Sequence, residues 1–166
     1  MIPNTEKRKR VSERKEDNFV ILPISLSDIF NSTKSFFDEN FRGAVITEKD
    51  EIFDGYTEVS PTGIAYYFKL LLNAVFGETP LRVSMSLLNG EFIIKTEWQT
   101  LREIPKSDID ELVTVSRLSG FSLDFLNDGE RSFAIARLKV AKQKYLALYA
   151  ISFEKMLESY NKVFFM

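Results

Sequence analysis

The fold is decided by residues 81–98, which read LRVSMSLLNGEFIIKTEW. Apolar side chains alternate with polar ones up to Asn89-Gly90, and an apolar run centred on Ile93 follows. Alternation with a period of two is typical of a half-buried strand, and Asn-Gly is a preferred pair for a type I′ turn. The stretch therefore predicts a β-hairpin.

A helix is predicted immediately before this hairpin. Pro61 suits the first helical position, where its missing N–H would have no partner, and Ser60 precedes it as a cap. Gly77 is predicted to end the helix. The apolar residues between them recur at helical spacing: Ile64, Tyr67, Phe68, Leu71, Leu72 and Val75. This stripe is wide enough to be buried against a sheet.

Another helix and another hairpin are predicted after residue 98. Ser107 and Asp110 have the spacing of a capping box, and Gly120 is placed to end the helix. Apolar residues then alternate with polar ones on both sides of a turn signal at residues 127–129, which read Asn-Asp-Gly. Residues 121–138 therefore predict a second hairpin.

The N-terminal half adds a helix and shorter elements. Residues 26–41 predict an amphipathic helix, and residues 44–47 predict a short strand. Residues 19–24 contain Pro23, which restricts them to an edge strand or a lead-in segment. The stretch up to Tyr56 is predicted to be a loop or a second short strand.

The order helix, strand, helix, hairpin, helix, hairpin predicts an α/β (α+β) two-layer sandwich, with a mixed, largely antiparallel sheet packed on helices. We expect a basic flexible tail over residues 1–18, one domain over residues 19–140 and an amphipathic helix over residues 141–166. The apolar face of that last helix consists of Tyr145, Leu148, Tyr149, Phe153, Met156, Leu157, Tyr160 and Phe164.

Composition limits the chemistry. The 166 residues are 45% hydrophobic and 28% charged, as expected for one globular domain. They include no Cys and no His, which excludes thiolate nucleophiles, imidazole bases, phosphoacceptor histidines and His/Cys zinc sites. We see neither a secretory signal nor an apolar stretch of the roughly 20 residues that span a bilayer. We expect a cytoplasmic protein without a membrane partner.

Charge is distributed unevenly. Residues 1–18 hold six Lys/Arg and four Asp/Glu, whereas the rest of the chain holds 16 and 20, a net charge of −4. An acidic body is a poor surface for nucleic acid, so we expect no nucleic-acid partner. The alternative is a regulatory nucleic-acid binder that uses the basic N-terminal arm.

Three places in residues 26–140 resemble the ATP-binding domain of sensor histidine kinases, in the superfamily that includes gyrase and MutL-type ATPases. Residues 70–75, with Asn73-Ala74, are similar to the N-box helix, in which the family places an asparagine on the magnesium that bridges the nucleotide phosphates. Residues 81–98 correspond to the strand pair that leads to the first glycine box. Residues 118–138 resemble the closing helix and terminal strands.

The same comparison with the family reveals departures. Lys69 stands where the N-box has a second polar ligand. The Asp-x-Gly-x-Gly motif aligns with Gln99, Leu101 and Glu103, so its aspartate and both glycines are replaced. The short segment between Trp98 and Ser107 also lacks the second glycine box. These departures imply that a nucleotide site on the family plan has been lost.

Several candidate site residues can be interpreted either as functional or as structural. Asn73 is either a weak cofactor ligand or, as we favour, a hydrogen-bonded packing residue. Trp98 either stacks on a planar ligand or, as we favour, belongs to the core. Capping of a helix N-terminus explains three neighbouring carboxylates better than a functional cluster does; they are Asp108, Asp110 and Glu111. Lys69 is expected to be solvated rather than an anion ligand.

We therefore expect a non-catalytic, degenerate member of the fold that acts by protein–protein interaction in signalling or regulation. The apolar face of residues 141–166 either packs back on the domain, as we favour, or forms the interface with another protein or a second copy. No catalytic residue, metal site or cofactor is assigned. The alternative from the enzyme class is a divergent histidine-kinase ATP-binding domain in which Asn73 holds magnesium and ATP.

Overall fold

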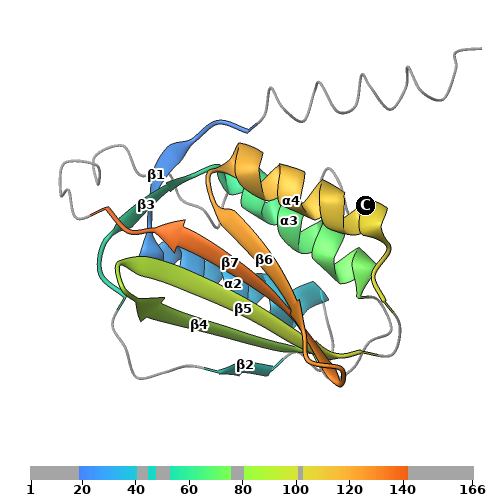
Figure 1. The fold of residues 1–166 in the computed structure, drawn as a ribbon. Helices are drawn as coiled ribbons and strands as arrows, with labels where there is room; N and C mark the ends of the chain where they lie inside the picture. Colours follow the sequence, from blue (N-terminus) through green and yellow to red (C-terminus); the bar gives the residue numbers. More distant parts are fainter. Residues whose placement is uncertain (1–18, 41–44, 48–52, 76–80, 101–102, 142–166) are drawn as a thin grey trace, which may run out of the picture.

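The protein forms two layers, a sheet and a group of helices behind it (Figure 1). The computed structural model describes residues 19–40, 45–47, 53–75, 81–100 and 103–141. Their arrangement confirms the predicted α+β sandwich. The basic tail over residues 1–18 and most of the C-terminal helix predicted over residues 141–166 lie outside the described residues.

The main sheet has five strands in the order β2-β4-β5-β7-β6. Their bounds are β2 Val45–Thr47, β4 Arg82–Leu88, β5 Glu91–Gln99, β6 Ser122–Asn127 and β7 Arg131–Lys139. β2 pairs with β4 in parallel, and all other pairs are antiparallel. Both predicted hairpins are confirmed. Asn89 and Gly90 have φ angles of 51° and 77°, the two positive values that a type I′ turn requires.

A smaller sheet lies beside the main one. Strands β1 (Leu22–Ser25) and β3 (Tyr56–Val59) pair antiparallel, with Pro23 opposite Glu58. Each is an edge strand of this two-stranded sheet, the setting in which proline is tolerated. Tyr56 joins the two sheets, because its N–H donates to the Ala141 carbonyl at 3.1 Å and its carbonyl accepts from the Ala141 N–H at 2.6 Å.

Three described helices cover one face of the main sheet: α2 (Leu26–Asn40), α3 (Pro61–Ala74) and α4 (Lys106–Ser119). The cap of α3 is confirmed, since the Ser60 hydroxyl accepts from the Gly63 N–H at 3.0 Å. The helix ends at Ala74, and Gly77 lies outside the described residues. Among the described residues, none forms a helix long and apolar enough to cross a membrane.

The predicted start of α4 is wrong. Pro105 is the N-cap, with no side-chain hydrogen bond, and the helix begins at Lys106. Ser107 is therefore already inside the first turn, too late to cap it. The proline sets this boundary because its extended backbone (φ −54°, ψ 140°) directly precedes the helical residues. The predicted end is confirmed: Gly120 adopts a left-handed conformation with φ 94°.

The core lies between the helices and the inner face of the sheet. Phe36 and Phe37 of α2 contact Phe68 of α3, with ring centroids 5.4 and 5.3 Å apart. Trp98 of β5 is only 2% exposed, which confirms its assignment to the core. Because burial removes apolar surface from water, these aromatic side chains hold the helices on the sheet.

Candidate functional site

The C-terminal end of α3 and the N-terminal end of α4 meet at a small hollow. Its volume is about 110 Å³. The described residues that line it are Leu70, Asn73, Ala74, Asp108, Glu111 and Leu112. The hollow therefore contains Asn73, the residue whose surroundings resemble the N-box of the family.

Asn73 is exposed, and its side chain makes no hydrogen bond to any described residue. The favoured reading of Asn73 as a hydrogen-bonded packing residue is therefore wrong. The physical reason is its position in the last turn of α3, on the side that turns from the core toward the hollow. Its amide is accessible to a ligand.

The hollow is acidic. Asp108 and Glu111 contribute two carboxylates, and the adjacent C-terminal end of α3 carries the negative end of a helix dipole. Asp108 lies in the first turn of α4, where its charge complements the dipole, as predicted. The same prediction is wrong for Asp110 and Glu111, because α4 begins at Lys106 and both residues lie beyond its first turn. Within the described ranges, no group of three or more His, Cys, Asp or Glu residues could hold a metal ion.

A tyrosine links the two helices beside the hollow. The Tyr66 hydroxyl of α3 donates to Glu111 Oε1 of α4 at 3.2 Å. Burial and the negative charge of Glu111 both raise the pKa of Tyr66 above its usual value. Lys69, one turn further along α3, is half-buried, and this partial burial lowers its pKa.

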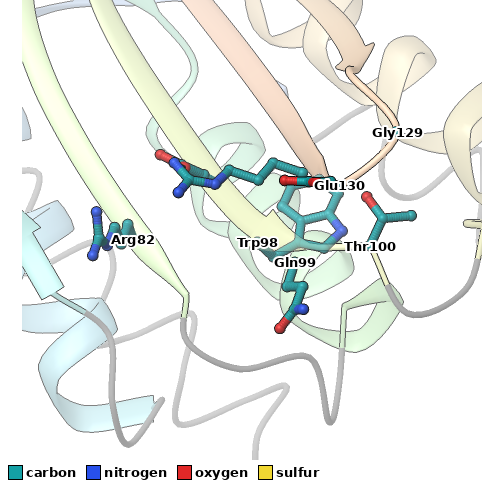
Figure 2. A pocket seen from close by; sticks show the side chains of 8 residues that line it. Arg82, Trp98, Gln99, Thr100, Gly129 and Glu130 are labelled. Carbon is teal, nitrogen blue, oxygen red and sulfur yellow. The ribbon is translucent and has the colours of Figure 1, made fainter.

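A larger groove of about 590 Å³ lies at the end of β5 (Figure 2). It is lined by Arg82, Glu97, Trp98, Gln99, Thr100, Gly129, Glu130 and Arg131. Two arginines and two glutamates give it mixed charge, and the guanidinium of Arg131 forms an ion pair with Glu97 at 2.8 Å. Such a lining suits a polar partner that carries both signs of charge.

The turn between β6 and β7 forms one wall of the groove. The Asp128 carboxylate accepts from the N–H groups of Arg131 at 2.7 Å and Glu130 at 3.0 Å. These hydrogen bonds stabilise the charged form and hold the pKa of Asp128 below its usual range. The Thr100 N–H donates to the Glu130 carbonyl at 2.9 Å, which joins this turn to the end of β5.

The structure describes two of the three residues that were aligned with the first glycine box. Gln99 is exposed and lines the groove, and Figure 2 shows it pointing away from the Trp98 ring. Leu101 lies outside the described residues. Glu103 is exposed and lines neither of the two cavities described above.

The sequence analysis considered Trp98 as a stacking residue but did not predict the charged wall that residues 129–131 form beside it. A usable signal was present. Glu97 and Arg131 have opposite charges and stand at the ends of strands that become neighbours in the sheet.

No protein-family model and no curated protein matches the chain. Solved structures do match its fold. The histidine kinase AdeS of Acinetobacter baumannii aligns with a TM-score of 0.55 at 11% identity, over 83% of this chain and 81% of that one. A histidine kinase of Burkholderia phymatum STM815 gives a TM-score of 0.53 at 13% identity, over 82% and 79%.

A third match shows which domain of histidine kinases the fold of this chain resembles. The ATP-binding domain of PrrB from Mycobacterium tuberculosis aligns with a TM-score of 0.52 at 14% identity, over 74% of this chain and 98% of that one. Nearly the whole of that isolated domain is therefore represented here. The described chain has the fold of the ATP-binding domain of histidine kinases.

Proposed function

We propose that this chain is a non-catalytic domain of the histidine-kinase ATPase fold that acts through protein–protein contacts in signalling or regulation. One observation supports the proposal above the others. The hollow at Asn73 measures about 110 Å³. Pockets that hold small molecules and cofactors typically measure roughly 300–1,000 Å³. The groove at the end of β5, at about 590 Å³, is within that range, but it shares no lining residue with the hollow, so Asn73 does not line a pocket of that size among the described residues.

The charges around the hollow support the same proposal. A nucleotide brings phosphates, which are stabilised by N–H donors and by cations. Asp108 and Glu111 instead place two carboxylates beside Asn73. At the end of β5, Gln99 replaces the aspartate and residues 99–105 contain no glycine, so a flexible backbone cradle for phosphate is missing from this stretch.

A second candidate function follows from the exposure of Asn73. Its amide oxygen is accessible, and a magnesium ion between this oxygen and the Asp108 carboxylate would have the hard oxygen ligands that it prefers. In that case the chain would be a divergent nucleotide-binding domain. Its nucleotide would lie over the hollow rather than inside it.

A thermal-shift titration distinguishes the two functions. The whole chain is heated with millimolar ATP or ADP, with and without Mg²⁺, because a ligand that binds only the native state raises the melting temperature. The non-catalytic domain is expected to show no dose-dependent shift. Asn73→Ala tests the site, and Asn40→Ala is its control, since Asn40 is also exposed in the last turn of a helix. Asn40→Ala additionally removes a hydrogen bond from Nδ2 to the Phe36 carbonyl, so the melting temperature of each variant without nucleotide is its reference.

A magnesium-dependent rise in melting temperature that disappears in Asn73→Ala and persists in Asn40→Ala would establish the divergent nucleotide-binding domain instead. A rise that persists in both variants would place a nucleotide elsewhere and would equally contradict the proposal. Sedimentation velocity over a range of concentrations then separates a homodimer from a chain that needs a different protein partner.

A further inference from the structure

The two faces of the five-stranded sheet differ in what covers them. Along β5, the side chains of Phe92, Ile94, Thr96 and Trp98 are buried and face the helices, whereas those of the alternate residues are only half-buried. β7 shows the same alternation. Figure 1 shows α2, α3 and α4 on the inner side, and no described element lies over the outer side.

The outer face carries a continuous apolar stripe. Leu126 of β6 pairs with Phe133 of β7, and Ile135 follows two residues later on the same face. Ile93 of β5 lies diagonally beyond Ile135, since its direct partner is Arg137. Leu126 is 56% exposed, whereas Phe133, Ile135 and Ile93 are half-buried. We refer to these four residues as the outer stripe.

Polar groups border the outer stripe on both sides. The Lys95 ammonium lies 4.6 Å from the centroid of the Phe133 ring, and Arg137 forms an ion pair with Asp124. An apolar stripe with a charged border is the usual form of a surface that another polypeptide covers. Antiparallel sheets that leave one face in water normally carry polar residues there, so the stripe indicates an occupant.

We propose that residues 142–166 of the same chain form an amphipathic helix that packs across the outer stripe. The proposal goes beyond the function above and does not depend on it. The apolar residues of this segment, from Tyr145 to Phe164, recur with a period near 3.6 and must be buried against some surface. The inner face of the sheet is already occupied by α2, α3 and α4.

The point at which the chain leaves the sheet suits this arrangement. β7, a central strand of the outer stripe, ends at Lys139, and Ala141 is still held by Tyr56. A helix over residues 142–166 would be about 37 Å long at 1.5 Å per residue. β7 has nine residues and spans about 30 Å. A helix that folds back from this end is therefore long enough to cover the whole face.

The tether favours this occupant over a second copy. A segment joined by a short linker acts at an effective concentration in the millimolar range. A separate molecule at micromolar concentration competes poorly with it for the same surface. A homodimer through the outer stripe is therefore the weaker arrangement and becomes an outcome of the test.

Cysteine cross-linking in the whole chain tests the proposal, because the native sequence contains no cysteine. Ile135→Cys is combined in turn with Leu148→Cys, Phe153→Cys or Leu157→Cys, and a short thiol cross-linker is added. At least one pair is expected to cross-link within the monomer. Thr114→Cys with the same partners is the control, since Thr114 is exposed on α4 in the helical layer.

Three results would overturn the proposal. Cross-links between chains, increasing with concentration, would assign the outer stripe to a second copy. Cross-links to residue 114 and not to residue 135 would place the segment on the helices. A complete lack of cross-links would leave the outer stripe without this occupant.

Hydrogen exchange supplies an independent measurement. Phe133→Asp puts a charge in the outer stripe and is expected to accelerate amide exchange in residues 142–166 about tenfold or more, because burial of the phenyl group is lost. Ser84→Asp, on the same face but off the stripe, is the matched control and should change little. Protection of α3 reports whether each variant is folded. Unchanged exchange in a folded Phe133→Asp chain would contradict the proposal.

Discussion

Gly63 of α3 lies directly against Ser119 of α4: a Cβ atom added at position 63 would stand 1.9 Å from Ser119 Oγ and 2.6 Å from Ser119 Cβ. The two helices are also joined there through the backbone, since the Ser60 N–H donates to the Ser119 carbonyl at 2.8 Å. The close approach fixes the relative position of the helices whose other ends form the hollow at Asn73.

Gly63→Ala is therefore expected to destabilise the protein by about 1–3 kcal/mol, the usual cost of overpacking a core. Urea unfolding of the variant and the parent chain measures the difference. Ser119→Gly removes both clashing atoms, so the double variant should lose less stability than the two single variants added together. Strict additivity would show that the two residues do not contact each other in solution.

The buried Tyr67 hydroxyl has no hydrogen-bond partner among the described residues. Tyr67→Phe is expected to raise the free energy of unfolding by about 1 kcal/mol, since an unpaired buried hydroxyl is removed while the ring contact with Phe121 stays. The melting temperature should rise by about 2–4 °C. The matched change Tyr66→Phe removes the hydrogen bond to Glu111 and should not stabilise. Equal effects of both changes would refute this account of Tyr67.

Alkaline pH should weaken the fold through the same residue. Burial raises the pKa of Tyr67 above the ordinary 10.0, so the unfolded chain releases this proton at a pH where the folded chain still retains it. The free energy of unfolding therefore falls as pH rises above about 10, by up to about 1.4 kcal/mol per pH unit for this group. Denaturant unfolding between pH 8 and about 11.5 measures the slope. Tyr67→Phe should make it shallower, and an unchanged slope would contradict the assignment.

The helix caps give a matched pair of serines. Ser60→Ala removes the acceptor for the Gly63 N–H at a fully buried position and should cost about 1 kcal/mol, within the roughly 0.5–2 kcal/mol usual for caps. Ser107→Ala should cost only a few tenths of a kcal/mol, because Ser107 is exposed and lies inside the first turn of α4. Thermal unfolding of both variants provides the comparison. A larger loss of stability in Ser107→Ala than in Ser60→Ala would show that Ser107 caps α4 after all.

Local signals in the sequence predicted most of the elements. The turn residues Asn89-Gly90 predict the first hairpin from the local sequence alone. Ser60-Pro61 predicts the start of α3 in the same way. The pairing of Tyr56 with Ala141 was not predicted, since these residues are far apart in the sequence and neither carries a turn or cap signal. For the same reason the sequence did not specify the strand order, the parallel pairing of β2 with β4 or the contact of Gly63 with Ser119.

The sequence predicted the position of the candidate site better than it predicted the exposure and the charge of its residues. Asn73 was identified because Asn73-Ala74, near the end of a predicted helix, resembles the N-box of histidine kinases. Its exposure was not predicted, because periodicity identifies the buried stripe of α3 but does not show which surface residues face α4. The acidity of the hollow depends on Asp108 and Glu111 meeting Asn73 across that interface, a contact that only the packed helices create.

Isothermal titration calorimetry with Mg²⁺-ATP tests the central claim most directly, because it measures binding at the hollow without heating the protein. The whole chain, Asn73→Ala and Asn40→Ala are titrated to millimolar nucleotide. The account predicts that none of the three gives a saturable heat. A saturable heat in the parent chain and in Asn40→Ala that is absent from Asn73→Ala would contradict it and would establish a nucleotide-binding domain.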